Sequence, residues 1–342
     1  MGAVAILADS VIWAFTSTLI TSKLARIDFL SVATFRLIFA AAFIWPAMFV
    51  LGAQGALWDM SFHTMWQLGL GGFAGYLLAE PGYALTLSLL GLTRGYTVVI
   101  GIFSLSAFVL PVIFLGESLE WQSIVGGVLI LTGVVIVTAR GRAPTSTPAV
   151  APSPNPTLDY DPHPSDPHPT TRPIDGGSDT ALATSAPATH VRLPGTTITL
   201  PRIVAGIIAA TATAILWATG LTILRAISPG IDAAAVATAQ LMPSALVILV
   251  LYLLVRRGRV FDRSVTPSNA SLMGLTGAMT AGFGTILVVF AVERIGAGPT
   301  AVLFAMSTIF ALPLGVIFLK ERVTIWGVGG ATLAVGGVAL LV

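Results

Sequence analysis

Long runs of apolar residues constrain this chain more than any other feature of its sequence. A helix needs about 20 mainly apolar residues to cross the hydrocarbon core of a bilayer. Backbone N–H and C=O groups find no water there, so each run is expected to be helical. Ten spans are predicted, at 3–22, 31–52, 66–89, 95–115, 121–139, 203–223, 233–254, 270–291, 297–318 and 323–342. The predicted fold class is therefore all-α integral membrane, a multi-pass protein of the cell membrane.

The composition also indicates that lipid is the main solvent. Of the 342 residues, 55% are hydrophobic and only 9% are charged, whereas about a quarter of a soluble domain is charged. A net charge of +2 gives no support for nucleic-acid binding, and the absence of cysteine excludes disulfides and thiolate sites. The expected partners are membrane lipids and a small-molecule substrate, with no nucleic acid and no cofactor. A homo-oligomer is compatible with the sequence but not required by it.

The segment 140–202 differs from the rest of the chain. It holds 13 of the 21 prolines, with Ser, Thr, Asp and Gly between them. Such a composition cannot bury apolar surface, so an extended, disordered linker is predicted. Asp161, His163, Asp166 and His168 form a short tandem repeat that could ligate a metal, although a polyproline spacer is the favoured interpretation.

The two halves flanking this linker, 1–139 and 203–342, align with each other. A constant shift of 204 residues pairs Trp13 with Trp217 and Asp28 with Asp232, and only the third span needs a different shift, of about 207. Each half contains five spans, which is an odd number. The two copies are therefore expected to have opposite orientations in the membrane, as inverted five-helix repeats. Alternating-access carriers have this architecture, with the solute site near the midplane.

Several segments near the end of each half resemble a known transporter family. They are Ile295 to Phe304, Leu312 to Thr324 and the glycine pairs at 329–330 and 336–337, with Phe114 to Leu119 and Gly126 to Gly133 in the first half. This pattern resembles the EamA repeats of the drug/metabolite transporter superfamily. The resemblance implies a ten-helix carrier whose cavity lies between the first four helices of each repeat, with the fifth helix peripheral.

Glu80 is the sharpest single candidate for a functional residue, because it lies near the middle of the third span. An acid at a helix centre costs about 2.5–3.5 kcal/mol on insertion scales, so it should face a cavity or a partner. Tyr76 and Tyr83 share its helix face. A substrate or proton site is one interpretation, and a structural ion pair with Arg36 or Arg94 is the other.

Further candidates lie on the other spans. Arg36 and Gln240 occupy matching places in the second and seventh spans, and Asp9 shares a helix face with Trp13. Hydration near the chain terminus is the favoured interpretation of Asp9, with ion coupling as the alternative. The predicted substrate-binding residues are Glu80, Arg36, Tyr76, Tyr83, Trp13, Trp217, Gln240, Ser307 and Thr308, and the predicted ion-coupling residues are Glu80 and Asp9.

The function predicted from the sequence is secondary transport, in the direction of export, of small metabolites or drugs. No zinc-protease, nucleophile-elbow or phosphate-loop motif is found, so an enzyme is not expected. The alternatives are a non-transporting scaffold or accessory subunit and an intramembrane enzyme acting on lipid-linked substrates. A metal site is not predicted within the spans.

The distribution of Lys and Arg predicts the orientation of the chain. When the remote linker residues Arg172 and Arg192 are left out, loops after odd-numbered spans hold twelve of these residues, whereas loops after even-numbered spans hold only Arg225 and Arg294. Because Lys and Arg near helix ends are retained in the cytoplasm, the linker is predicted there and both termini outside. The resemblance to EamA carriers implies the reverse.

Overall fold

The computed structural model describes residues 1–24, 27–90, 92–116, 121–140, 190–192, 199–256, 265–319 and 325–341. Within them, six stretches of helix are long and apolar enough to cross a membrane, and they are Gly2–Leu24, Leu30–Val50, Val98–Leu115, Arg202–Ile227, Ala233–Val255 and Pro267–Ile295. The remaining predicted spans coincide with helices that are shorter, interrupted or less apolar. The chain is thus a helical integral membrane protein.

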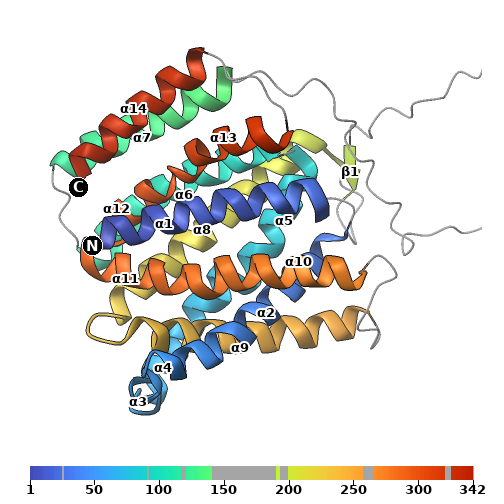
Figure 1. The fold of residues 1–342 in the computed structure, drawn as a ribbon, viewed down its shortest axis with the longest axis vertical. Coiled ribbons are helices and arrows are strands. Elements are labelled where there is room, and N and C mark those ends of the chain that lie inside the picture. The colour runs from blue at the N-terminus through green and yellow to red at the C-terminus, as the bar shows by residue number, and fades with distance from the viewer. Residues whose placement is uncertain are drawn as a thin grey trace, which may run out of the picture.

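The first half begins with α1 and ends with α7 (Figure 1). Its elements are α1 (Gly2–Leu19), η1 (Ile20–Leu24), α2 (Phe29–Val50), α3 (Gln54–Trp58), α4 (Phe62–Gly72), η2 (Phe73–Leu78), α5 (Ala79–Leu90), α6 (Leu92–Leu115) and α7 (Trp121–Arg140), where η marks a π-helical segment.

The second half has a similar order of helices, with α12 and α13 in the place of α6. Its elements are α8 (Arg202–Ile227), α9 (Ala233–Val255), α10 (Pro267–Gly277), η3 (Ala278–Gly284), α11 (Thr285–Ile295), α12 (Ala297–Phe304), α13 (Ser307–Leu319) and α14 (Ile325–Leu341). Two short strands precede it, β1 (His190–Arg192) and β2 (Thr199–Pro201), paired antiparallel with Val191 opposite Leu200. These strands lie in the segment predicted to be disordered, so that expectation does not hold for them. Most of the predicted linker, with its His and Asp repeat, lies outside the described residues.

Side-chain caps start the matching helices of the two halves in the same way. Asp28 accepts hydrogen bonds from the second and third backbone N–H groups after it, and Asp232 does the same at the start of α9. Ser61 caps α4, and Thr266 caps α10. Such caps are worth about 1 kcal/mol each, because they satisfy backbone donors that a helix start leaves free.

These starts also correct the alignment of the third span. Its two copies begin at Phe62 and Pro267, their π-helical segments begin at Phe73 and Ala278, and both positions differ by 205 residues. The ends at Leu90 and Ile295 differ by the same amount. The shift of about 207 expected from glycine matches is therefore wrong, and 205 relates the starts of the two copies, the starts of their π-helical segments and their ends.

Two pairs of helices from opposite halves, α2 with α9 and α5 with α8, run antiparallel where they meet. Arg256, at the end of α9, forms an ion pair of 2.6 Å with Asp28 at the start of α2, and Tyr252 lies 3.1 Å from the Ser31 hydroxyl. At the start of α8, the Arg202 side chain donates to the carbonyl of Leu89 near the end of α5. Long-range polar contacts thus join ends of helices that are far apart in sequence.

Glycines allow the backbones of α4 and α9, and those of α10 and α2, to lie very close together. A Cβ atom at Gly72 would overlap the carbonyl oxygen of Gln240, and one at Gly277 would overlap that of Arg36. Similarly, a side chain at Gly2 would meet Ile295, and one at Gly206 would meet Leu90. Small residues at such positions let helix backbones approach in lipid, where no hydrophobic force drives helices together.

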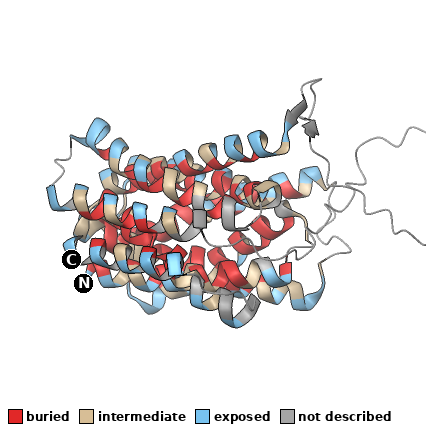
Figure 2. Cartoon of the chain, turned by 90° about the horizontal axis from the view of Figure 1, so that it is seen from above, coloured by how far each residue is buried: buried red, intermediate tan, exposed pale blue. Residues whose placement is uncertain are grey.

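Buried residues concentrate in the middle of the bundle, and exposed ones lie on its outer faces and ends (Figure 2). Large apolar side chains such as Phe43, Leu246 and Ile113 are exposed on the helices, which suits contact with lipid. The helices α7 and α14 pack on each other at one edge of the bundle (Figure 1). This matches the peripheral fifth helices that the family resemblance implies.

We expect Gly277→Ala to destabilise the protein, because the new methyl group has no space beside the Arg36 carbonyl. Overpacking of this kind costs about 1–3 kcal/mol, so the thermal midpoint of the purified protein in detergent should fall. Gly101→Ala is the matched control, since nothing lies within 4 Å of its Cβ position. It should leave the midpoint unchanged or raise it slightly. Equal midpoints for the two variants would contradict this account of the helix contact.

Candidate functional site

A cavity of about 110 Å³ lies where the two halves meet. The π-helical segments of the third and eighth spans border it. The segment η2 does so through Gly75 and Tyr76, and η3 through Thr280 and Gly284. Helices α1, α4, α5 and α6 of the first half and α8, α9, α11 and α12 of the second complete its wall. The cavity is thus shared between the repeats. Because π-helical turns occur frequently at functional sites, a ligand is expected in this part of the fold.

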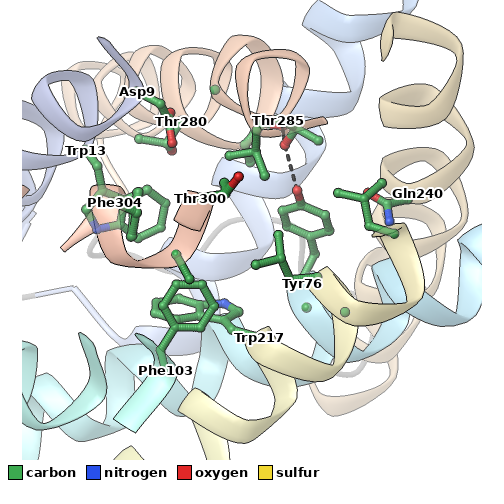
Figure 3. Close-up of a pocket in the computed structure, with 18 of the residues that line it drawn as sticks. Asp9, Trp13, Tyr76, Phe103, Trp217, Gln240, Thr280, Thr285, Thr300 and Phe304 are labelled. Atoms are coloured by element: carbon green, nitrogen blue, oxygen red, sulfur yellow. Dashed lines mark hydrogen bonds between the residues drawn. The ribbon is translucent and has the colours of Figure 1, made fainter. Parts of the chain in front are cut away.

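Aromatic rings form much of the cavity wall. Trp13 and Trp217, which occupy matching positions of the two repeats, meet edge to face with ring centroids 5.7 Å apart. Phe304 packs on Trp13 at 5.5 Å, and Phe103 packs on Trp217 at 6.0 Å. Figure 3 shows these four rings around the pocket, with Tyr76 across from them. Edge-to-face pairs of this kind are mutually stabilising, so the wall is preorganised.

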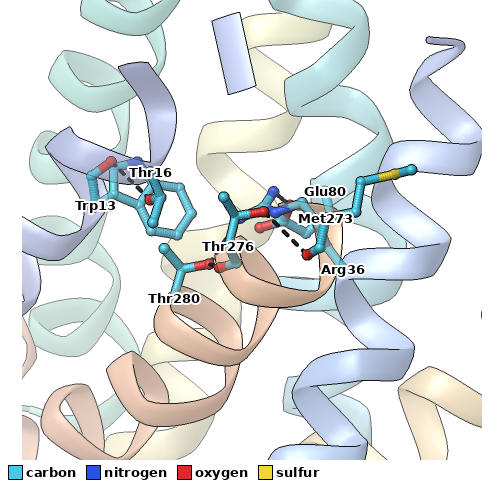
Figure 4. A network of polar contacts seen from close by, with 7 residues as sticks. All are labelled: Trp13, Thr16, Arg36, Glu80, Met273, Thr276 and Thr280. Carbon is cyan, nitrogen blue, oxygen red and sulfur yellow. Dashed lines mark hydrogen bonds and ion pairs between the residues drawn. The ribbon is translucent and has the colours of Figure 1, made fainter. Parts of the chain in front are cut away.

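An ion pair lies beside this wall. Nη1 of Arg36 is 2.8 Å from Oε2 of Glu80, and Nη2 donates to the hydroxyl of Thr280 at 2.8 Å (Figure 4). The Arg36 and Glu80 residues are only 5% and 6% exposed. The guanidinium also lies 5.9 Å from the centroid of the Trp13 ring. The sequence-based expectation that Glu80 contacts Arg36 is therefore met in the structure. The side chain of Arg94, the other partner considered, lies outside the described residues.

The second repeat has neutral residues at the matching positions. A shift of 204 relates Arg36 to Gln240, and a shift of 205 relates Glu80 to Thr285. The Thr285 hydroxyl lies 2.7 Å from the phenol oxygen of Tyr76. The two repeats therefore bring polar groups to equivalent places, but only the first contributes charge there.

Asp9 is a further acidic side chain at the cavity, and it lies in the wall itself. It is 2% exposed, and its Oδ1 atom has no hydrogen-bond partner among the described residues. The Oδ1 atom fits against η3 because Gly284 has no side chain there. The favoured sequence interpretation, a hydrated acid near the terminus, is wrong. Asp9 lies more than one helical turn inside α1, which begins at Gly2, and neighbouring helices cover it.

The structure separates the other sequence-predicted residues by position. The cavity wall contains Asp9, Trp13, Tyr76, Glu80, Trp217 and Gln240. Arg36 lies behind this wall, and the ring of Tyr83 packs on Trp13 and Trp217 without belonging to the wall. Ser307 and Thr308 are also outside it, and the Ser307 hydroxyl is bonded to that of Tyr96.

Three threonines in the wall, Thr280, Thr285 and Thr300, were not singled out from the sequence. Hydroxyls in transmembrane helices usually bond to their own backbone, which hides any further role. All three do so here, but Thr280 and Thr285 also contact Arg36 and Tyr76. An alignment of the repeats at the shift of 205 would have drawn attention to Thr285. Among the described residues no group of three His, Cys, Asp or Glu could hold a metal ion.

Comparisons with known proteins agree with this architecture. None of the curated proteins compared with the chain matches it. A solved structure, described as a crystal structure of a protein, superposes with a TM-score of 0.68 at 15% identity, covering 99% of this chain and 96% of the other. That likeness concerns the fold alone. The family model of the EamA-like transporter family matches residues 1–139 and 204–342, which include both halves. The chain belongs to the EamA-like transporter family, within the drug/metabolite transporter superfamily.

Proposed function

We propose that this membrane transporter is a secondary carrier that moves small metabolites or drugs across the cell membrane by alternating access, in the direction of export. The observation that carries the proposal is the cavity of about 110 Å³ between the repeats. Its wall holds polar groups from both halves, such as Glu80 and Gln240. Alternating-access carriers place their solute site at such a repeat interface.

The proposed architecture is ten transmembrane helices in two inverted repeats. When each residue is replaced by its counterpart in the other half, the contact of Gly72 with Gln240 becomes the contact of Gly277 with Arg36, which the structure also contains. The same exchange converts the contact of Gly2 with Ile295 into that of Gly206 with Leu90. These contacts therefore obey a two-fold relation between the repeats.

The direction of the proposed axis follows from the helix pair α2 and α9. These two helices exchange with each other, and they run antiparallel, since Asp28 pairs with Arg256 at opposite ends of their sequences. A two-fold axis that relates antiparallel helices must be perpendicular to them. For membrane-spanning helices this axis lies in the membrane plane, as in inverted-repeat carriers.

The two rival functions have less support. A scaffold or accessory subunit needs no buried charges, and Arg36, Glu80 and Asp9 are costly to keep within a membrane without a role. An intramembrane enzyme acting on lipid-linked substrates needs a catalytic cluster near one interface. The ionisable groups of the cavity instead lie among aromatic rings at the centre of the repeat contact.

Overexpression of the protein should protect cells against some toxic metabolites, dyes or drugs, because outward transport lowers their internal concentration. Growth of an overexpressing strain across a panel of such compounds measures this effect. Accumulation of a protective compound inside cells should then fall relative to an empty-vector strain. Increased accumulation would reverse the proposed direction, and unchanged accumulation of every compound would favour the scaffold.

Neutral residues should be able to replace the Arg36–Glu80 ion pair without loss of stability, but not without loss of transport. Arg36→Gln and Glu80→Thr should each destabilise the protein, because breaking a buried pair costs about 3–5 kcal/mol. The double variant reproduces the neutral pair Gln240 and Thr285 of the other repeat, so its thermal midpoint should recover. Its efflux of a compound found in the panel should nevertheless fall at least about tenfold, equivalent to roughly 1.4 kcal/mol of barrier. If the double variant exports the compound at the wild-type rate, the ion pair has only a structural role.

The orientation proposed from the charges places the linker in the cytoplasm. The chain has no cysteine, so single cysteines at Ser165, Ser268 and His63 report their own exposure to an impermeant maleimide. Ser268 and His63 are exposed and begin the two copies of the third span, at opposite ends of inverted repeats. In intact cells the variant His63→Cys should be labelled, whereas Ser165→Cys and Ser268→Cys should react only after lysis. The opposite pattern would invert the topology.

A further inference from the structure

The acidic and basic side chains around the cavity are not matched in number. Arg36 and Glu80 pair with each other at 2.8 Å, which leaves Asp9 as the remaining acidic side chain of the described cavity wall. Ionisable groups buried in a membrane protein are expected to have a partner, because an isolated charge is strongly disfavoured there. The partner of Asp9 is therefore to be sought in the cavity.

No neighbouring group of the described wall supplies that partner. The hydroxyl of Thr280 donates to the carbonyl of Thr276 at 2.7 Å, and that of Thr300 donates to Gly296 at 2.6 Å. Arg36 donates to Glu80 and Thr280. These hydroxyls and the two terminal nitrogens of Arg36 thus bond elsewhere. Nε1 of Trp13 and Nε of Arg36 have no hydrogen-bond partner among the described residues, and Oδ1 of Asp9 stays unsatisfied as well. A ligand with an N–H donor and a positive charge would satisfy it.

The rest of the wall suits the organic part of such a ligand. Trp13, Trp217, Phe103 and Phe304 present ring surfaces around the same space (Figure 3). Aromatic faces attract cations and also pack well on alkyl groups. A small inorganic cation would instead need several oxygen ligands, and among the described residues no group of three His, Cys, Asp or Glu could hold one. A cavity of 150 Å³ is known to hold benzene, so a volume of about 110 Å³ admits a small alkyl group.

We infer that the cavity binds the protonated amine of a small organic solute, with its ammonium group on the Asp9 carboxylate and its alkyl part against Trp13 and Trp217. This inference rests on the proposed carrier function and names the substrate class of the same cavity. The Asp9 carboxylate accepts an N–H hydrogen bond and balances the charge of the amine. The Arg36–Glu80 pair remains intact, because neither of its members is needed to neutralise the ligand.

Equilibrium binding to the purified protein tests the inference without transport. The probes are isobutylammonium chloride and isobutanol, which have the same shape and an X–H donor but differ in charge. A ligand that binds the folded state raises the thermal midpoint in proportion to its occupancy. Titrations of the midpoint should give an apparent Kd for the ammonium at least about tenfold lower than for the alcohol, as hydrogen bonds to charged groups exceed neutral ones.

The variant Asp9→Asn keeps the shape of the side chain and removes its charge. It should lose the preference for the ammonium, while Asp59→Asn, which removes an equal charge at an exposed position outside the wall, should retain it. Equal binding of ammonium and alcohol by the wild-type protein would overturn the inference, even if Asp9→Asn fails to fold. So would an ammonium preference that persists in a folded Asp9→Asn protein.

Two further arms separate the remaining outcomes. Sodium and potassium chloride at equal ionic strength should produce no shift of the thermal midpoint that depends on Asp9. If such a shift occurs and isobutylammonium does not compete with it, the site belongs to an inorganic cation and the inference is overturned. Uptake of isobutylammonium into proteoliposomes tests the carrier separately. Binding without transport of any amine would count against the carrier and leave the amine site. Transport of other solutes without amine binding would count against the amine site and leave the carrier.

Discussion

Helix contact without a hydrophobic driving force is the constraint on which this structure depends. Lipid is as apolar as the side chains that face it, so helices associate through close packing and internal polar contacts. Gly72 and Gly277 provide the closest packing, against the backbones of Gln240 and Arg36. These contacts hold the second span against the eighth and the seventh span against the third. As a result, the side chains of Arg36 and Gln240 reach the region between the halves, where the cavity forms.

The π-helical segments η2 and η3 follow directly after those glycine contacts. A π turn widens the helix and disturbs the regular i→i−4 bonding, so it changes which side chains face the repeat interface. Tyr76 in η2 and Thr280 in η3 both face the cavity, one from each repeat. Tyr76 reaches across to Thr285, and Thr280 accepts from Arg36. The irregular segments thereby connect the ion pair of the first repeat with the neutral residues of the second.

Features that depend on local chemistry could be predicted from the sequence, whereas features that depend on packing could not. Asp28 and Asp232 cap their helices because their spacing to the apolar runs dictates it, and Glu80 pairs with Arg36 because a lone acid in a span needs a partner. The burial of Asp9 depends on η3, whose approach at Gly284 no local pattern reveals. The shift of 205 in the third span is also hidden, since glycines match by chance in helices rich in small residues.

The repeats share a scaffold but divide its chemistry unequally. At matching positions the first repeat has Asp9, Arg36 and Glu80, and the second has Thr213, Gln240 and Thr285. Each substitution keeps a polar group and removes a charge. A fully symmetric site would double the number of ionisable side chains buried in the membrane, each of which is costly to keep there. Confining the charges to one repeat avoids this cost. It also gives the cavity one charged and one neutral side, so that a solute carrying a single charge has one preferred orientation.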